Sequence, residues 1–257
     1  MEDNKAHVQS VGRALQLIEL LSEEKHEISL TDISRKIGWP KSTVHGLLST
    51  MCSYQVVEQS TVTGRYRLGI RLFELGSIVA RSWDISSIAK PHMQQLNLEL
   101  SEMIQLAMDR NGEVLYIDKL ESNQMLRIVS DIGIRLPMHC SGLGKVILAN
   151  KPFSEVKRII SNKGLKRMTS RTITTMEELS SELDKIREQG YAIDDQEIME
   201  GLRCVAAPIY DVDGKVNYAI SVSGLSFNMK GSYLDKVIQR LKETAANISS
   251  DMGYKGS

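Results

Sequence analysis

The sequence predicts an α+β protein in which a winged helix-turn-helix comes first, linker helices follow, and an antiparallel sheet flanked by helices completes the chain. Three observations support this class. Apolar residues between 29 and 51 recur at helical spacing on both sides of a glycine, and two short β-compatible runs come next. Beyond residue 101, hairpin signals alternate with amphipathic helices, which is typical of an α+β domain. The expected domain boundaries are 1–69, 70–100 and 101–257.

The composition is that of a soluble globular protein with room for two domains. Of the 257 residues, 42% are hydrophobic and 25% are charged, and 32 basic residues balance 32 acidic ones. Cys52, Cys140 and Cys204 lie far apart without a C-x-x-C pair, which argues against a disulfide framework and a cysteine zinc site. The apolar runs are short and the N-terminus lacks a signal-peptide core. We therefore expect a cytoplasmic protein without membrane attachment.

Three helices are expected in the N-terminal part. Apolar residues from 11 to 24 trace one helical stripe. Ser29 and Asp32 then have the spacing of a capping box, Gly38 interrupts the next helix, and Pro40 suits the first position of the third. The apolar positions on the two sides of Gly38 are Leu30, Ile33, Ile37, Val44, Leu47, Leu48 and Met51. This arrangement of two short helices around a glycine-containing turn predicts a helix-turn-helix.

Opposite its apolar stripe, the third helix presents short polar side chains, one cation and one imidazole. These groups can approach a phosphate or a base edge without a bulky barrier. The residues are Lys41, Ser42, Thr43 and His45. We predict them as DNA contacts. The alternative is an αα corner in an ordinary helical domain, because amphipathic helix pairs are common.

A β-hairpin is expected directly after this helix pair, in the position of a wing. The runs QVVEQ and RYRLG are β-compatible, and Thr63-Gly64 makes a plausible turn between them. Arg65 and Arg67 are two residues apart on one strand, so both project on one face and can meet phosphates. Two solvated surface arginines are the alternative interpretation.

Charge is distributed unevenly along this neutral chain. Between Ser29 and Arg71, six cations face two acids, a local surplus of four positive charges that favours a nucleic-acid partner. The cations are Arg35, Lys36, Lys41, Arg65, Arg67 and Arg71, and the acids are Asp32 and Glu58. Arg35 and Lys36 could contribute to binding, although solvated charges are the favoured interpretation for these two.

The hydrophobic periodicity after residue 70 predicts the helices and strands of the linker and of the C-terminal domain. Helices are expected at 70–85, at 88–100 with Pro91 near its start, at 154–161, at 176–190 and at 232–253. Strands are expected at 103–109, 113–120, 126–131, 204–211 and 216–224. Asn111-Gly112 is a strong hairpin signal between the first two of these strands, and Thr175 and Glu178 have capping-box spacing.

The ordered motifs resemble the IclR family of bacterial transcription regulators. The matching stretches are SVGRALQLIELL, LTDISRKIGWPKSTVHGLLSTM, TGRYRLG, LPMHCSGLGKVILA, DDQE before GLRCVAAPI, and AISVSG. The resemblance implies a winged helix, a linker helix and a GAF-like domain that binds a small organic effector, in a dimer or a dimer of dimers. Two residues depart from the family pattern: Gly46 stands where arginine is common in the recognition helix, and Gly12 replaces an acidic residue.

The resemblance also places an effector site in the C-terminal domain. Its positions correspond here to Gly142, Leu143, Asp194, Cys204, Ser221 and Ser223, with an apolar wall at Ile128, Leu136 and Leu202. The chemistry agrees, because backbone N–H groups of a glycine-rich helix start suit a carboxylate. Other interpretations stay open: surface serines for Ser221 and Ser223, a small buried hydrophobe for Cys204, a capping or turn residue for Asp194, and core packing for the apolar positions.

No catalytic residue and no cofactor is predicted. The phosphate-loop pattern G-x-x-x-x-G-K-[ST], H-E-x-x-H and G-x-S-x-G are all absent. His139, Cys140 and Ser141 read as adjacent strand residues, whose side chains point to opposite faces and cannot form a dyad. No metal is predicted, and a metal site built from His92, His139 and a cysteine stays an alternative.

These observations predict a DNA-binding transcriptional regulator that is not an enzyme, with repression of a catabolic operon as the expected mode. A small organic acid in the C-terminal domain would control it, and a homodimer or dimer of dimers would bind a double-stranded inverted-repeat operator. The alternative is a GAF-like module, catalytic or ligand-binding, whose helix-turn-helix contacts protein. Salt-dependent DNA binding separates the two.

Overall fold

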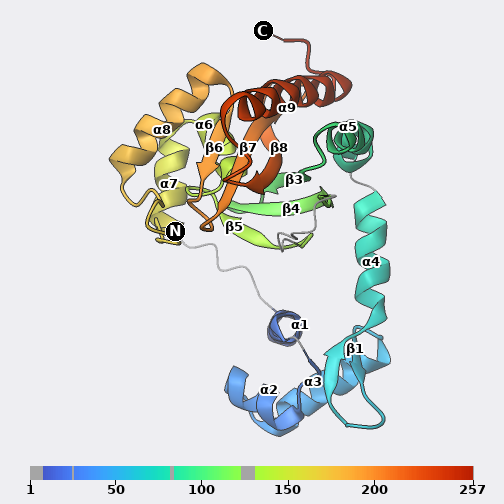
Figure 1. Cartoon of the computed structure of the whole chain (residues 1–257). Coiled ribbons are helices and arrows are strands. Elements are labelled where there is room, and N and C mark those ends of the chain that lie inside the picture. The colour runs from blue at the N-terminus through green and yellow to red at the C-terminus, as the bar shows by residue number, and fades with distance from the viewer. Residues whose placement is uncertain (1–7, 25, 82–83, 123–130, 257) are drawn as a thin grey trace. The chain divides into compact units, whose positions relative to one another are not determined.

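The computed structural model describes residues 8–24, 26–81, 84–122 and 131–256. The chain forms two compact units, Met1–Trp83 and Asp84–Ser257 (Figure 1). The predicted α+β class is confirmed: the first unit contains the helix-turn-helix, and the second contains a curled antiparallel sheet with helices. The domain boundaries at residues 69 and 100 stay a prediction.

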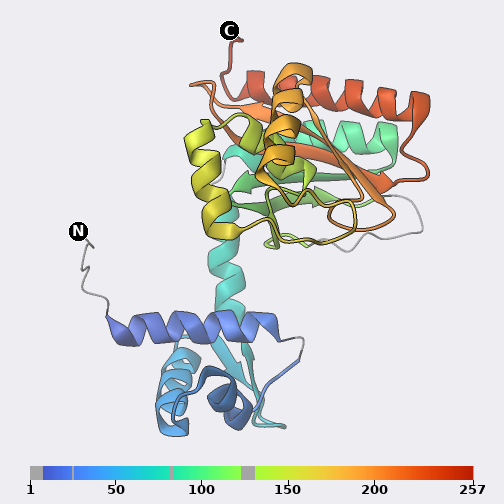
Figure 2. The ribbon, with the colours of Figure 1, turned by 90° about the vertical axis from the view of Figure 1, so that its left-hand side faces the viewer.

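Three helices, a hairpin and a fourth helix make up the N-terminal unit (Figure 2). In order they are α1 (Gln9–Glu23), α2 (Leu30–Ile37), α3 (Lys41–Ser53), β1 (Val57–Gln59), β2 (Tyr66–Leu68) and α4 (Ile70–Arg81). β1 and β2 pair antiparallel, and an isolated bridge joins Ile28 to Tyr66. The helix-turn-helix and its wing are therefore held on one apolar core, to which α1 contributes the fully buried Leu17.

The ends of α2 follow the predicted local rules. The Ser29 hydroxyl accepts from the Asp32 backbone N–H at 3.2 Å, which is the N-cap bond of a capping box, and it donates to the Asp32 carboxylate at 2.6 Å. Gly38 closes the helix with φ 73°, a left-handed conformation that favours glycine. The prediction for Pro40 was wrong by one position, because it is the N-cap of α3 and not its first helical residue.

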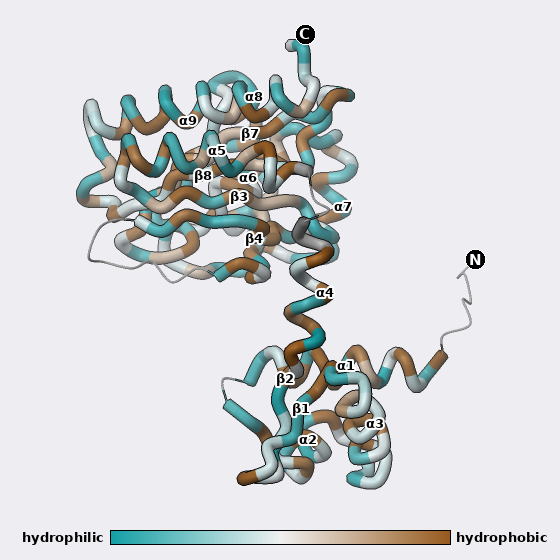
Figure 3. Tube along the Cα trace, turned by 90° about the vertical axis from the view of Figure 1, so that its right-hand side faces the viewer, coloured by the Kyte–Doolittle hydropathy of each residue, from teal (hydrophilic) through white to brown (hydrophobic). Residues whose placement is uncertain are grey.

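The C-terminal unit is one six-stranded antiparallel sheet in the order β5-β4-β3-β8-β7-β6. Its elements are α5 (Asp84–Leu100), β3 (Met103–Asp109), β4 (Glu113–Leu120), β5 (Arg135–Pro137), α6 (Gly142–Ala149), α7 (Phe153–Lys163), α8 (Met176–Gln189), β6 (Ala192–Asp195), β7 (Leu202–Tyr210), β8 (Val216–Leu225) and α9 (Gly231–Asp251). α5 and α9 cover one face (Figure 3), and α6, α7 and α8 cover the other.

Strong local signals located most of these elements. β3 and β4 have the predicted bounds, and Asn111 and Gly112 between them have φ of 58° and 78°, as a tight hairpin turn requires. Helix α5 begins four residues earlier than predicted, because Ile85 extends its buried stripe. Pro91 consequently lies inside the helix and not near its start.

Two short strands were not predicted. β5 and β6 form the two edges of the sheet, and each has only one neighbouring strand. Three or four residues carry too little periodicity to be recognised without the partner strand. The predicted strand at 126–131, except for Asp131, lies outside the described residues, and so does Ile128.

Candidate functional site

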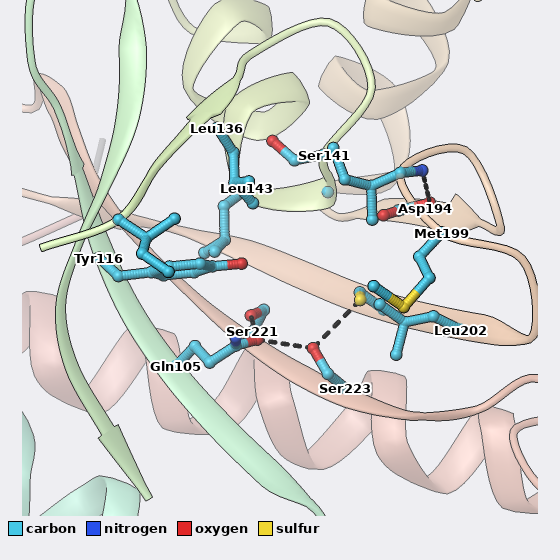
Figure 4. A pocket seen from close by; sticks show the side chains of 14 residues that line it. Gln105, Tyr116, Leu136, Ser141, Leu143, Asp194, Met199, Leu202, Ser221 and Ser223 are labelled. Carbon is cyan, nitrogen blue, oxygen red and sulfur yellow. Dashed lines mark hydrogen bonds between the residues drawn. The ribbon is translucent and has the colours of Figure 1, made fainter. Parts of the chain in front are cut away.

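A pocket lies between the sheet and the start of α6 (Figure 4). Its cavity volume is about 90 Å³. Its lining residues are Gln105, Tyr116, Ile134, Leu136, Ser141, Gly142, Leu143, Asp194, Ile198, Met199, Leu202, Cys204, Ser221 and Ser223. All six residues that the sequence singled out for an effector are among them, together with the two described members of the predicted apolar wall.

One end of the pocket is the N-terminus of α6. The Ser141 hydroxyl caps the helix by accepting from Gly144 N–H at 3.2 Å, and it donates to the Pro137 carbonyl at 3.0 Å. The amides of Gly142 and Leu143 belong to the first turn, where no helical carbonyl can accept from them. Their partial positive charge faces the pocket and favours an anion.

The opposite wall consists of polar side chains on three adjacent strands. Ser221 lies opposite Gln105 across β8 and β3, and Ser223 lies opposite Cys204 across β8 and β7. The hydroxyls of Ser223 and Ser221 donate to Gln105 Oε1 at 2.7 and 3.3 Å (Figure 4). Both serines are buried, so the exposed-face interpretation was wrong. Ser223 Oγ also lies 3.1 Å from Cys204 Sγ. When the two hydroxyl protons are directed at Gln105, the serine oxygen lone pairs can accept from a ligand.

Asp194 adds a buried carboxyl to this wall. Its Oδ1 accepts from the Glu197 N–H at 2.7 Å and from the Ile198 N–H at 3.4 Å. It therefore both lines the pocket and caps the loop after β6, as the capping interpretation expected. Burial raises the pKa of Asp194 to about 6, against the opposing effects of these amides and of Lys145. Burial also raises the pKa of the Cys204 thiol, so this wall residue stays uncharged.

Lys145 on α6 contacts β6 and the loop that follows it, and no sequence motif indicated a role for this residue. It is fully buried, and its Nζ donates to the Ile193 carbonyl at 2.7 Å, contacts Glu182 Oε1 at 3.2 Å and pairs closely with Glu197. Its partners lie 37 to 52 residues away in sequence, which is why spacing alone could not reveal it. Gln105 was also missed, although a polar residue within the apolar run of β3 was a usable signal.

The catalytic alternative finds no support in the described residues. His139 and Cys140 lie in the turn between β5 and α6, so their assignment to a strand was wrong. Burial lowers the pKa of His139, whose Nε2 lies 3.0 Å from the Lys166 carbonyl, and burial raises the pKa of Cys140 to about 12. Among the described residues, no three His, Cys, Asp or Glu side chains are grouped to hold a metal ion.

The candidate DNA contacts lie on one exposed face of α3. Lys41, Ser42 and His45 are exposed and Thr43 is half-buried, while Val44 on the opposite side is fully buried. Within the described chain, Lys41 forms no ion pair. This face is thus available to a partner.

The two wing arginines differ from each other. Arg67 pairs with Glu58 at 3.0 Å and reaches Glu27 at 3.6 Å, so its charge is already partly neutralised. Among the described residues, the Arg65 side chain makes a single long contact of 3.5 Å, with the Glu27 carbonyl. Both side chains are exposed. Arg35 and Lys36 pair with Asp32 and Glu24, as expected of solvated surface charges.

No helix in the described parts of the chain is long and apolar enough to cross a membrane.

Comparisons with known proteins cover nearly the whole chain. Residues 10–61 match the IclR helix-turn-helix domain, and residues 78–250 match the C-terminal domain of the bacterial transcriptional regulator IclR. The chain is 35% identical over 247 residues to the transcriptional regulator XynR of Escherichia coli, covering 96% of this chain and 98% of XynR. It is 33% identical over 247 residues to the transcriptional repressor AllR of Klebsiella pneumoniae, covering 96% and 91%. The structure of an IclR homologue from Microbacterium hydrocarbonoxydans, complexed with 4-hydroxybenzoate, matches with a TM-score of 0.82 at 28% identity, covering 95% of this chain and 98% of that one.

Proposed function

Because the chain belongs to the IclR family of bacterial transcriptional regulators, which are not enzymes, we propose that it is a cytoplasmic repressor of a catabolic operon. It binds an inverted-repeat operator through α3 and the wing, and a small organic acid in the C-terminal pocket changes its affinity for that operator. The observation that supports this best is the pocket itself, where an anion-binding helix end faces a wall of hydrogen-bond acceptors.

The two ends of the pocket favour a particular class of effector. A carboxylate fits the amides at Gly142 and Leu143 in the first turn of α6. The hydroxyl oxygens of Ser221 and Ser223 and the carboxyl of Asp194 accept hydrogen bonds, so they favour ligand hydroxyls. The apolar wall favours a carbon skeleton between the two ends. A hydroxylated organic acid has all three features, and 4-hydroxybenzoate, which the M. hydrocarbonoxydans homologue holds, is one example.

DNA binding is assigned to the exposed face of α3 and to the wing. Lys41, Ser42 and His45 present hydrogen-bonding groups that suit base edges and phosphates, and Thr43 lies beside them. Arg65 is the stronger candidate for a phosphate contact, since Arg67 would first have to leave two carboxylates.

Replacement of Lys41 by alanine tests the DNA assignment. We expect operator affinity to fall about tenfold at 0.1 M salt, with a log–log salt slope shallower by about one for each half-site contacted. Arg65→Ala should have a larger effect than Arg67→Ala. Fluorescence anisotropy with upstream intergenic DNA and non-specific competitor measures both quantities, and Lys157→Ala, at an exposed lysine on α7, is the control.

The same titrations, repeated with a panel of hydroxylated organic acids, test control by an effector. We expect at least one acid to change operator affinity, and by linkage the operator must change the affinity for that acid by the same factor. If Lys41→Ala left the salt slope unchanged, we would conclude that α3 does not belong to the DNA interface. Binding no tighter than to competitor DNA, with and without the acids, would favour the alternative in which the helix-turn-helix contacts protein.

Self-association is proposed from exposed apolar side chains on two helices of the N-terminal unit. Val8, Val11 and Leu15 follow each other at helical spacing at the start of α1 and are 65%, 57% and 56% exposed. On α4, Phe73 and Ile78 are 71% and 60% exposed, and apolar segments recur along this helix (Figure 3). An inverted repeat requires two copies, and a second copy of the same surface would cover these side chains.

Replacement of Phe73 by aspartate is expected to shift the protein from dimer toward monomer, because a carboxylate cannot be buried in an apolar interface without a partner. Operator affinity should then fall about 100-fold, since each half-site is bound singly. Sedimentation velocity at micromolar concentration measures the shift. Val212→Asp, at a turn residue that is 70% exposed, is the control. If Phe73→Asp stays dimeric, the interface lies elsewhere.

A further inference from the structure

A single buried ammonium group lies among three carboxyl groups beneath the pocket. Lys145 on α6 is 0% exposed, and it contacts Glu197 in the loop after β6 and Glu182 on α8. The third carboxyl is that of Asp194, which lines the pocket and is joined to this loop through the Glu197 amide. Asp194 and Glu197 are 1% and 6% exposed, whereas the Glu182 side chain reaches solvent.

The charges in this cluster do not balance. Two deeply buried carboxyl groups, Asp194 and Glu197, share one buried cation. Glu197 Oε2 is buried without a hydrogen-bond partner among the described residues, which is costly for an ionised carboxylate.

Among the described residues, no cation other than Lys145 pairs with Asp194 or Glu197. Neighbouring Asp195 pairs with two cations, Arg171 at 2.6 Å and Arg203 at 2.7 Å, and because the Arg171 side chain is 55% exposed, water screens the extra positive charge. The thiols of Cys140 and Cys204 stay neutral, because burial raises the pKa of each. Glu182 adds a further negative charge beside Lys145. Within the described residues, Lys145 is thus the one cation that pairs with the carboxyl groups of this cluster, and the remaining negative charge has no ion-pair partner.

We propose that Asp194 and Glu197 together retain one proton near neutral pH, and that the pocket takes up an organic anion more tightly in this protonated state. The proposal rests on the proposed function, because it assigns an anionic ligand to the pocket. Asp194 belongs both to the pocket wall and to the acidic cluster, so an arriving anion increases the negative charge that the cluster already carries. Protonation of the cluster removes that excess, and ligand binding and proton binding therefore favour each other.

The direction of the pH dependence follows from the same groups. Burial raises the pKa of Asp194 to about 6 and that of Glu197 to about 7, while Lys145 opposes both shifts. At these two groups the folded protein therefore binds more protons than the unfolded chain between about pH 4.5 and pH 7. Their contribution to folding stability falls as pH rises through this window, whereas buried His139, whose pKa is lowered, contributes in the opposite direction. Anion affinity falls as pH rises through neutrality, by up to about tenfold per pH unit above it.

The first test needs no ligand. In protein carrying carboxyl-¹³C glutamate, we expect one resonance to titrate near pH 7 and to be missing in Glu197→Gln. The unfolding equilibrium constant of the wild type should rise relative to that of Glu197→Gln by up to about tenfold per pH unit between pH 5 and 7. Glu177→Gln, at an exposed carboxyl on α8, is the control and should keep both behaviours. Titration of Glu197 near pH 4.5 would overturn the proposal.

The second test measures the coupling, with 4-hydroxybenzoate and gluconate as probes. Calorimetric titrations at pH 6, 7 and 8, in buffers of different ionisation enthalpy, should show proton uptake on binding. The affinity of Glu197→Gln should be nearly independent of pH, and Asp194→Asn serves as a second variant. Binding without proton uptake would overturn the coupling. If neither acid binds at any pH, neither acid is an effector and the coupling to these ligands is wrong. The ligand-free titration then still decides whether Asp194 and Glu197 hold a proton.

Discussion

Replacement of Gly144 by alanine is expected to destabilise the C-terminal unit by about 3 kcal/mol or more, and to abolish binding of an organic acid. A Cβ at this position would lie 2.4 Å from both the Cα and the carbonyl oxygen of Met138. These are backbone atoms of the turn before α6, so no side-chain rotation can relieve the clash. The first turn of α6 would have to move away from the sheet, and the Gly142 and Leu143 amides would move with it.

Gly142→Ala is the matched comparison, because it makes the same change two residues earlier in the same helix. Its Cβ would lie 3.2 Å from the Ala206 methyl group, a contact that a small adjustment relieves, and alanine favours the helix by about 1 kcal/mol. We expect this variant to fold with a stability within about 1 kcal/mol of the wild type, yet to bind organic acids more weakly, because the methyl group would lie against Asp194 and Cys204, which line the pocket. Scanning calorimetry with and without 4-hydroxybenzoate measures both effects. Equal unfolding temperatures for Gly144→Ala and the wild type would contradict the packing argument.

The sequence predicted those parts of the fold that local chemistry decides. The capping pairs at Ser29 and Thr175 mark the helix starts that the structure has, because each side-chain cap involves residues only three positions apart. The β3–β4 hairpin was equally local, since Asn111 and Gly112 alone permit the turn between two apolar runs. In contrast, β5 and β6 become strands through pairing with β4 and β7, and short edges of this kind are not encoded in their own residues.

The pocket was predictable only in part, for the same reason. The family resemblance gave eight lining residues, the six effector positions and two of the apolar wall, and the structure gathers them around one cavity. Gln105 joins them because strand register places it opposite Ser221, which no spacing along the chain expresses. His139 was assigned to a strand although it lies in a turn, and Arg67 read as a free cation although Glu58, nine residues earlier, pairs with it across the hairpin. Each of these features depends on which strand lies beside which.

Lys145→Met is expected to destabilise the C-terminal unit by about 3–5 kcal/mol at pH 8, because it removes the only cation that contacts Glu197 among the described residues. The methionine fills a similar volume, so lost packing contributes little. What remains is a pair of buried carboxyl groups without a counter-charge, and each must either stay ionised at high cost or bind a proton. Since Lys145 holds down the pKa of Glu197, its loss raises that pKa further. The deficit should therefore shrink between pH 8 and pH 6, as protonation removes the uncompensated charge.

Combining Lys145→Met with Glu197→Gln separates this electrostatic cost from the loss of the hydrogen bond to the Ile193 carbonyl. The double variant has one buried carboxyl fewer, so it should regain most of the lost stability at pH 8 and show little pH dependence, although the Ile193 carbonyl still lacks its donor. Urea unfolding of the wild type, both single variants and the double variant at pH 6 and 8 completes the cycle. If Lys145→Met were as stable as the wild type at pH 8, the cluster would not carry the charge assigned to it. If instead the double variant were no more stable than Lys145→Met, the lysine would act by joining α6 to β6 and not by neutralising the acids.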